Sequence, residues 1–195
     1  MKKVLLPIII IALGFTGCDS SDEVTKTTYT LDEEHSVVEW TGYSPVLYHD
    51  GSFAVESAGI EVVDGKVKGG TFTIPIASIK NFDLPDDVKP VLLNHLKSPD
   101  FFNLAVYPNA TFKITKVQEV EAGHMVSGDF TMLGKTHAIS FPAEIAFEAG
   151  KVKVEAEFKL DRTKWGMNYA ADPSLGDHHV LPEVDIYLNV VGNKL

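Results

Sequence analysis

The segment VLLNHLKSPDFFNLAVYPNATFKIT, residues 91–115, carries the most structural information in the chain. Leu92, Leu93 and Leu96 recur at helical spacing, which predicts a short helix with one apolar face. The helix is expected to end at Ser98, because the residue before a proline is pushed out of the α region. A helix this short belongs to a connection between other elements.

The second half of the segment predicts a return to extended structure. Phe101 and Phe102 form an apolar anchor after the helix, and we expect Phe102 to plug one end of the fold. From Ala110 onward, Phe112 and Ile114 alternate with polar residues, which is typical of a half-buried strand. A helix at an opening, an aromatic plug and a strand entering a sheet together predict the lid of a β-barrel.

The rest of the chain reads as short strands separated by turn signals. Asp64-Gly65 and Ala149-Gly150 are turns of the kind that join antiparallel strands. Besides the strand that begins at Ala110, strands are expected at residues 35–42, 52–64, 66–79, 128–132, 139–147, 152–160 and 184–190. No helical period is long enough for a βαβ unit. The predicted fold class is therefore all-β, an antiparallel eight-stranded barrel with a short helical lid.

Five pieces of the sequence, in this order, resemble the YceI family of polyisoprenoid-binding bacterial proteins. They are LDEEHSVVEWTGY (31–43), IPIASIKNFDL (74–84), HLKSPDFF (95–102), YPNATFKIT (107–115) and SGDFTMLGKTHAISFP (127–142). The resemblance covers about residues 29–191. It implies a lipocalin-like barrel over residues 29–195 that encloses a long isoprenoid-like or other lipid chain.

Apolar side chains are the expected binding surface. Six phenylalanines share the inward parity of their strands: Phe72, Phe112, Phe130, Phe141, Phe147 and Phe158. An acyl chain gains roughly 0.8 kcal/mol per buried CH₂, so no exact polar contacts are needed. With the resemblance, the predicted lipid-binding residues are Trp40, Phe72, Ile74, Leu93, Leu96, Phe112, Ile114, Phe130, Met132, Phe141, Phe158, Ile186 and Leu188. The sequence leaves open which of them line a cavity and which fill it.

The N-terminus predicts export and lipidation. Lys2 and Lys3 precede an apolar run of residues 4–15, and small residues lead to Cys18. This order resembles a lipoprotein signal, so we expect a signal peptide at residues 1–17, acylation at Cys18 and a flexible tether at residues 18–28. An ordinary secretory leader is the alternative. With either leader, the expected location is the periplasm or cell surface of a bacterium. Acylation would add a membrane anchor. The sequence of the tether leaves open which membrane carries it.

Composition argues against several other functions. The net charge of −10 makes nucleic acid an unexpected partner, because phosphate binding needs clustered Lys and Arg. Cys18 is the only cysteine, so the barrel has no disulfide or thiolate metal site. Nothing matches a serine-hydrolase elbow or a zinc-binding HExxH motif. Neither an enzyme nor a metal site is expected, and the only expected cofactor is the bound lipid, with an isoprenoid quinone among the options.

Three hypotheses follow. The favoured one is a lipid-binding lipoprotein that carries or sequesters a polyisoprenoid, a quinone or another long-chain lipid. A second is an enzyme on the same barrel that uses His35, His95 or the His178-His179 loop, although structural roles are favoured for these histidines. A third is a structural or adhesion lipoprotein with a filled barrel. The sequence leaves open whether the protein forms a homodimer.

Overall fold

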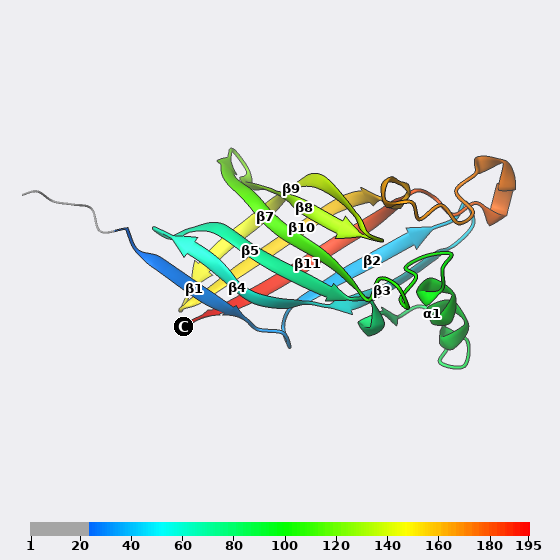
Figure 1. Cartoon of the computed structure of the whole chain (residues 1–195), viewed down its shortest axis with the longest axis horizontal. Helices are drawn as coiled ribbons and strands as arrows, with labels where there is room; N and C mark the ends of the chain where they lie inside the picture. Colours follow the sequence, from blue (N-terminus) through cyan, green and yellow to red (C-terminus); the bar gives the residue numbers. More distant parts are fainter. Residues whose placement is uncertain (1–23) are drawn as a thin grey trace, which may run out of the picture.

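The computed structural model describes residues 24–195 (Figure 1). The predicted signal peptide, Cys18 and most of the predicted tether lie outside these residues. The strands are β1 Lys26–Leu31, β2 Val37–Tyr43, β3 Tyr48–Ala54, β4 Glu56–Val63, β5 Lys66–Pro75, β6 Lys80–Asn81, β7 Asn109–Val120, β8 Gly123–Met132, β9 Lys135–Glu148, β10 Lys151–Asp161 and β11 Glu183–Lys194. The helical elements are α1 Lys89–Lys97 and the 3₁₀ turns η1 Ile76–Ser78, η2 Arg162–Trp165 and η3 Pro173–His178.

The strands close into an antiparallel barrel. Hydrogen-bonded neighbours follow the order β1-β4-β5-β7-β8-β9-β10-β11, and β11 pairs again with β1. β11 pairs with β1 near its C-terminal end and with β2 along most of the rest of its length. On the other side, β4 pairs with β1 and β3 pairs with β2. Thus β1 with β2, and β3 with β4, each form one interrupted wall strand. The predicted eight-stranded antiparallel barrel is confirmed.

The interruption between β1 and β2 is held by β11. The amide N–H of Asp32 donates to the carbonyl of Val191 at 2.8 Å. The N–H of Val191 in turn donates to the Ser36 hydroxyl at 3.0 Å. β1 itself begins earlier than the sequence suggested, since Lys26 pairs with Val63. Residues 26–28, predicted as tether, are therefore part of the barrel wall, because their backbone continues the ladder of β4.

The helix and its flanking loops gather at one end of the barrel, which we call the mouth (Figure 1). α1 ends at Lys97 and Ser98 turns extended, as the Ser98-Pro99 pair predicts. The aromatic plug differs from the expectation. Phe101 is the buried ring, whereas Phe102 is half-buried and packs edge-on against Phe53 at 5.5 Å. The chain turns directly after α1, and this turn points Phe101 into the core.

Buried side chains form a cluster near each end of the barrel and a third, smaller one of Val126, Phe141, Ala143 and Ala156. At the mouth, Trp165 and Phe101 belong to a cluster that includes Met132 and Met167. At the opposite end, a second cluster contains Tyr29, Ile60, Val62, Val67, Val152 and Val190. Ile60 and Val152 are almost completely inaccessible, so this end of the barrel is plugged. Among the described residues, no helix has the length and apolar character needed to span a bilayer.

Candidate ligand-binding site

A narrow cavity runs inside the barrel between the two packed ends. Its volume is about 120 Å³, and only Val, Ile, Leu and Phe side chains line it. β2, β4, β5 and β7 to β11 all contribute, because strand geometry sends alternate side chains to the inside. The deepest residues include Ile60 and Val190 of the plugged cluster. We call this space the inner cavity.

The lining side chains show that the barrel is not filled. Phe72, Phe112, Phe158 and Leu188 face the inside of a closed sheet, yet each is only half-buried. In a protein core packed to normal density, such residues would lose nearly all their accessible surface. Here that surface faces the inner cavity. The barrel therefore keeps apolar area available inside, where a slender apolar molecule could cover it.

Three phenylalanines form an aromatic strip along the inner wall. The rings of Phe141 and Phe158 are stacked at 4.4 Å, nearly parallel at 6°. Phe112 lies tilted against Phe141 at 5.5 Å. Gly128 on β8 makes room for this strip, since a Cβ there would collide with the Phe112 ring. The strip offers flat apolar faces to a ligand without directional polar contacts.

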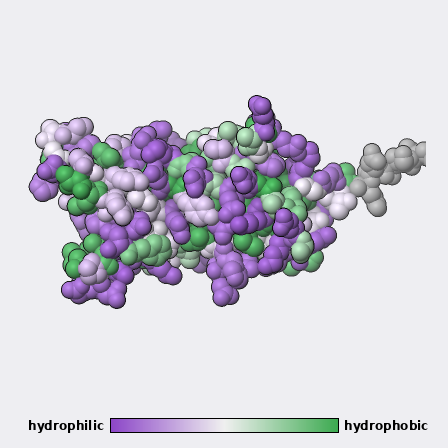
Figure 2. Space-filling view, turned by 180° about the vertical axis from the view of Figure 1, so that it is seen from behind, coloured by the Kyte–Doolittle hydropathy of each residue, from purple (hydrophilic) through white to green (hydrophobic). Residues whose placement is uncertain are grey.

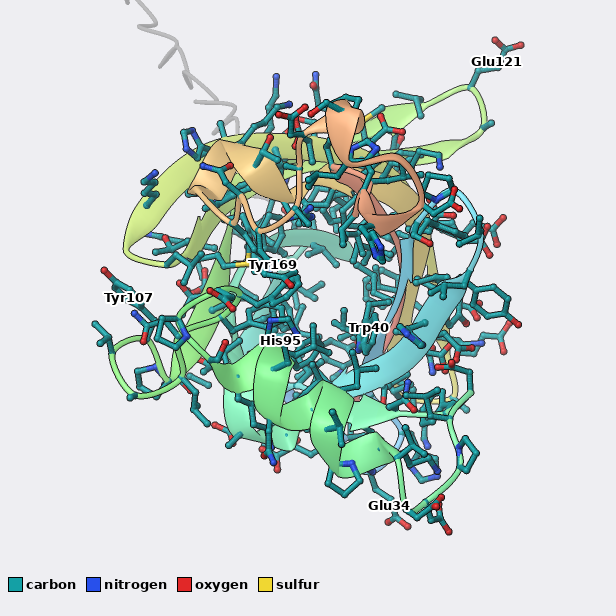
Figure 3. All side chains as sticks on the ribbon, turned by 90° about the vertical axis from the view of Figure 1, so that its right-hand side faces the viewer. Glu34, Trp40, His95, Tyr107, Glu121 and Tyr169 are labelled. Atoms are coloured by element: carbon teal, nitrogen blue, oxygen red, sulfur yellow. The ribbon has the colours of Figure 1, made fainter. Side chains whose placement is uncertain are left out.

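A second, wider space of about 430 Å³ opens at the mouth, and we call it the outer cavity. Figure 3 looks into this end and shows His95 of α1 and Tyr169 of the 162–182 loop beside each other, with Trp40 across from them. The two cavities share five lining residues at their junction: Val38, Ile74, Phe130, Leu160 and Ile186. Together they form a tunnel that opens at the mouth and runs toward the packed cluster at the opposite end. We refer to both cavities as the tunnel.

Arg162 organises the loop that forms one side of the mouth. Its side chain is only 3% exposed and donates to four backbone carbonyls of the same loop. Nη1 bonds Met167 O at 2.5 Å, Nη2 bonds Tyr169 O at 3.0 Å and Val180 O at 2.6 Å, and Nε bonds Leu181 O at 3.2 Å. The loop is therefore tied to one buried guanidinium.

The charge of Arg162 has no direct carboxylate partner within residues 24–195. Burial lowers the pKa of its guanidinium, and the nearby Asp161 carboxylate opposes that shift. The guanidinium carbon lies 5.9 Å from the centre of the Phe101 ring. Since Arg162 also lines the outer cavity, the mouth carries a fixed positive charge beside the tunnel opening.

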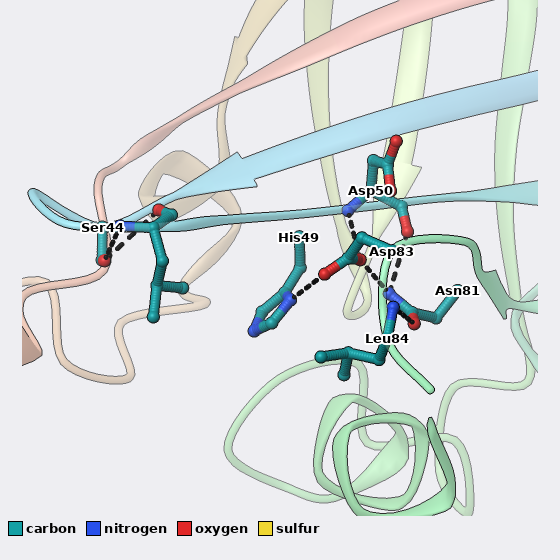
Figure 4. A network of polar contacts seen from close by, with 7 residues as sticks. Ser44, His49, Asp50, Asn81, Asp83 and Leu84 are labelled. Atoms are coloured by element: carbon teal, nitrogen blue, oxygen red, sulfur yellow. Dashed lines mark hydrogen bonds and ion pairs between the residues drawn. The ribbon is translucent and has the colours of Figure 1, made fainter. Parts of the chain in front are cut away.

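A polar network fixes another side of the mouth (Figure 4). His49 Nδ1 lies 2.7 Å from Asp83 Oδ2, and Asp83 Oδ1 accepts from the Asp50 amide at 3.1 Å and from Asn81 Nδ2 at 2.5 Å. Burial alone would raise the pKa of Asp83, but these hydrogen bonds outweigh it and hold that pKa below its usual value. Asn81 also accepts from the Leu84 amide, so the network anchors the segment before α1 to β3.

Aromatic contacts link α1 to the 162–182 loop. The His95 ring meets Tyr169 edge-on at 4.7 Å and Phe101 at 5.1 Å. His95 Nε2 is held by Asp100 Oδ2 at 3.0 Å, on the solvent side. These contacts close one flank of the mouth and leave the remainder open.

The structure places the predicted lipid-binding residues on the tunnel wall, with one exception. Phe72, Phe112, Ile114, Phe141, Phe158 and Leu188 line the inner cavity, Trp40, Leu96 and Met132 line the outer one, and Ile74, Phe130 and Ile186 line both. Leu93 packs against the mouth cluster without reaching either cavity. Leu92 takes its place, because residues four apart, such as Leu92 and Leu96, share a helix face. Lipid binding by these residues remains a prediction.

Phe147 and the histidines lie in different settings. Phe147 has the expected inward parity but sits at the far rim, 38% exposed and edge-on to Tyr29. His35 is exposed on the outside, paired with Asp32. His178 lines the outer cavity, whereas His179 is buried without doing so. Residues 24–195 contain no group of three His, Cys, Asp or Glu side chains that could hold a metal ion.

Sequence reasoning missed the polar part of the site. Arg162, His49 and Tyr169 all line the outer cavity but were not selected. Alternation did indicate that Val154 and Leu160 of β10 face inward. No local pattern signals that Arg162 is buried, because its four acceptors depend on how the whole loop folds back.

Comparisons with known proteins agree with this architecture. A family model described as YceI-like domain matches residues 29–192. Protein YceI of Escherichia coli O17:K52:H18 is 26% identical over 210 aligned positions, covering 98% of each chain. The fold is similar to that of BcnA from Burkholderia cenocepacia, with a TM-score of 0.66 and 20% identity over 83% of this chain and 98% of that one. It is also similar to a polyisoprenoid binding domain from Saccharophagus degradans, implicated in plant cell wall breakdown, with a TM-score of 0.60 and 16% identity over 86% and 98% of the chains.

Proposed function

The chain belongs to the YceI-like domain family, and on this basis we propose that it binds one long-chain lipid inside its barrel. The carrying observation is the inner cavity, whose lining is entirely apolar and includes inward-facing residues of a closed wall, such as Phe112 and Phe158, that are only half-buried. Filling it with a hydrocarbon chain would release roughly 0.8 kcal/mol per buried CH₂. Water in this cavity would find no hydrogen-bond partners on the apolar walls, so it would be displaced readily by a hydrocarbon chain.

The shape of the tunnel favours a ligand with a slender tail and a compact polar head. The tail would occupy the inner cavity, which runs toward the packed cluster of Ile60 and Val152. The head would lie in the outer cavity, where Arg162, His49 and His95 are among the polar neighbours. An isoprenoid quinone or a polyprenol fits both requirements. The structural neighbour described as a polyisoprenoid binding domain supports this ligand class.

The proposed role is to carry or sequester this lipid outside the cytoplasm. The predicted lipoprotein signal would attach the protein to a membrane through acylated Cys18. Replacing Cys18 with alanine should then move the protein from the membrane fraction to the soluble fraction. Unchanged membrane partitioning of the variant would rule out the anchor while leaving the lipid-binding proposal intact.

A chain-length series tests the proposed ligand. The chain has two tryptophans, of which Trp40 lines the outer cavity and Trp165 packs on Phe130 at 5.3 Å. Both should report a quinone by fluorescence quenching. We expect the affinity to rise with each isoprene unit until the tunnel is full and then to level off. An affinity independent of tail length would show that the tail stays outside the barrel.

A further inference from the structure

Exposed apolar side chains gather around the mouth. Six of them, each at least 45% exposed, project from different segments of this end, and we call them the apolar rim: Val46, Leu47, Phe82, Val91, Val106 and Leu175. Exposed apolar residues that occur singly need no explanation, but a group at one end of a molecule marks an interaction surface. Figure 2 shows apolar side chains at this end, on its left, among charged ones.

The apolar rim surrounds the tunnel opening. Leu47 lies in the turn between β2 and β3 and also lines the outer cavity. Val91 lies on α1, one position before Leu92, which faces that cavity. Leu175 lies in η3, within the 162–182 loop that Arg162 holds. The rim therefore contains residues from both flanks of the opening.

Neither terminal strand of the barrel covers the apolar rim. β1 begins at Lys26 and β11 ends at Lys194, and their pairing through Tyr29 and Lys194 lies at the end opposite the mouth (Figure 1). Within residues 24–195, no further segment remains to fold over the rim. A partner for the rim would therefore come from outside the barrel.

We propose that the apolar rim docks the mouth onto the surface of a neutral lipid bilayer. The side chains project from separate segments around the opening, so they suit a fluid surface better than the fixed relief of a protein. This step rests on the proposed function: a water-insoluble ligand would have to enter and leave through this opening. Docking would let it pass between bilayer and tunnel without crossing water.

The charges of the rim segments favour a neutral surface over an anionic one by a small acidic excess, since residues 82–100 and 162–182 carry six aspartates against Lys89, Lys97, Arg162 and Lys164. Asp87, Asp172 and Asp177 are exposed on the loops that carry the rim. Within residues 24–195, none of them has a lysine or arginine partner. Anionic lipids would repel these carboxylates, as they attract basic segments. The net charge of the whole chain, −10, acts in the same direction.

Vesicle flotation tests the proposal. The sample is the segment 24–195, which contains every strand of the closed barrel and excludes any acyl anchor. Vesicles of phosphatidylcholine are compared with vesicles that also contain phosphatidylglycerol, at low salt. The rim variant carries Val46→Asp and Val91→Asp. The matched control is Val120→Asp, since Val120 is 45% exposed at the far end of the barrel, in the β7–β8 hairpin.

We expect the unaltered segment and the Val120→Asp control to float with phosphatidylcholine vesicles, and less with the anionic ones. The rim variant should bind at least about tenfold more weakly, because two charges replace inserted apolar groups. Equal flotation of rim and control variants, or no flotation of the unaltered segment, would overturn the proposal. The proposal would also be overturned if size-exclusion chromatography showed a dimer for the unaltered segment and the control but a monomer for the rim variant, since a second copy would then cover the rim.

Mass spectrometry of lipid bound to the same samples separates this proposal from the proposed function. Lipid in a protein that does not float would refute docking and leave lipid binding standing. Flotation that depends on the rim, in a protein that never carries lipid, would support docking and count against the tunnel ligand.

Discussion

Substituting phenylalanine for Val38 should block the tunnel at its junction. Val38 lies on β2, is half-buried and lines both the inner and the outer cavity. The larger side chain would project into the space that a lipid tail must pass. Lipid occupancy should therefore fall sharply, even though the substitution keeps the wall apolar.

The same substitution should stabilise the lipid-free protein, although it lowers lipid occupancy. An empty apolar space of about 120 Å³ corresponds to roughly 3 kcal/mol of lost stability, at ~24 cal/mol per Å³. A phenylalanine ring would fill part of it, so the free energy of unfolding of lipid-free protein should rise by about 1–2 kcal/mol. For a domain of this size, that gain corresponds to a Tm increase of roughly 2–8 °C.

The assay combines urea unfolding of delipidated protein with mass spectrometry of co-purified lipid. Val37→Phe is the matched control, because Val37 is the preceding residue on the same strand and faces the other side of the sheet. It should leave lipid content unchanged. A Val38→Phe protein destabilised by about 1–3 kcal/mol, as overpacking of a filled core produces, would contradict the tunnel. So would a stabilised variant that retains its lipid.

Other substitutions test the mouth. Arg162→Met should lower the free energy of unfolding by about 3 kcal/mol, because one buried and three partly buried carbonyls lose their donor, and protease should then cut within residues 163–182. A protected loop would show that the guanidinium is dispensable. Phe101→Ala should cost about 3–5 kcal/mol in chemical denaturation, and Phe102→Ala clearly less, since only Phe101 is buried; equal losses would contradict this division. Hydrogen bonds lower the pKa of Asp83, so the stability they give is fully present above the ordinary value of 3.8 and is lost as the pH falls through the lower folded value. Asp83→Asn should therefore make the free energy of unfolding depend less on pH in the acid range. An unchanged dependence would assign the acid loss of stability to other groups.

Much of the barrel follows from the period of two in its strands. The alternation in β10, where Val152, Val154 and Phe158 face inward, defines register directly, because a slip by one residue would turn them all to solvent. β1 was missed because its sequence, KTTYTL, is too polar to stand out from the acidic segment before it. Its assignment comes from partners far away in the chain, on β4 and β11.

The site was predictable only in its apolar part. Alternation shows that Phe112 or Phe130 points inward, but not whether the inside is filled, since the space depends on how the closed wall is staggered and tilted. Likewise, helical spacing places Leu92, Leu93 and Leu96 together without showing that Leu93 turns from the cavity. The polar groups at the mouth are assembled by long-range loop contacts that leave no local pattern.

Native mass spectrometry of the intact barrel tests whether the tunnel holds a lipid. The protein is purified from its host without delipidation and compared with the Val38→Phe variant prepared in the same way. We expect one adduct per chain with the mass of a long-chain isoprenoid or another long-chain lipid, and its loss in the variant. A chain that stays free of adduct, both as isolated and after incubation with polyprenols and isoprenoid quinones, would contradict the proposed function.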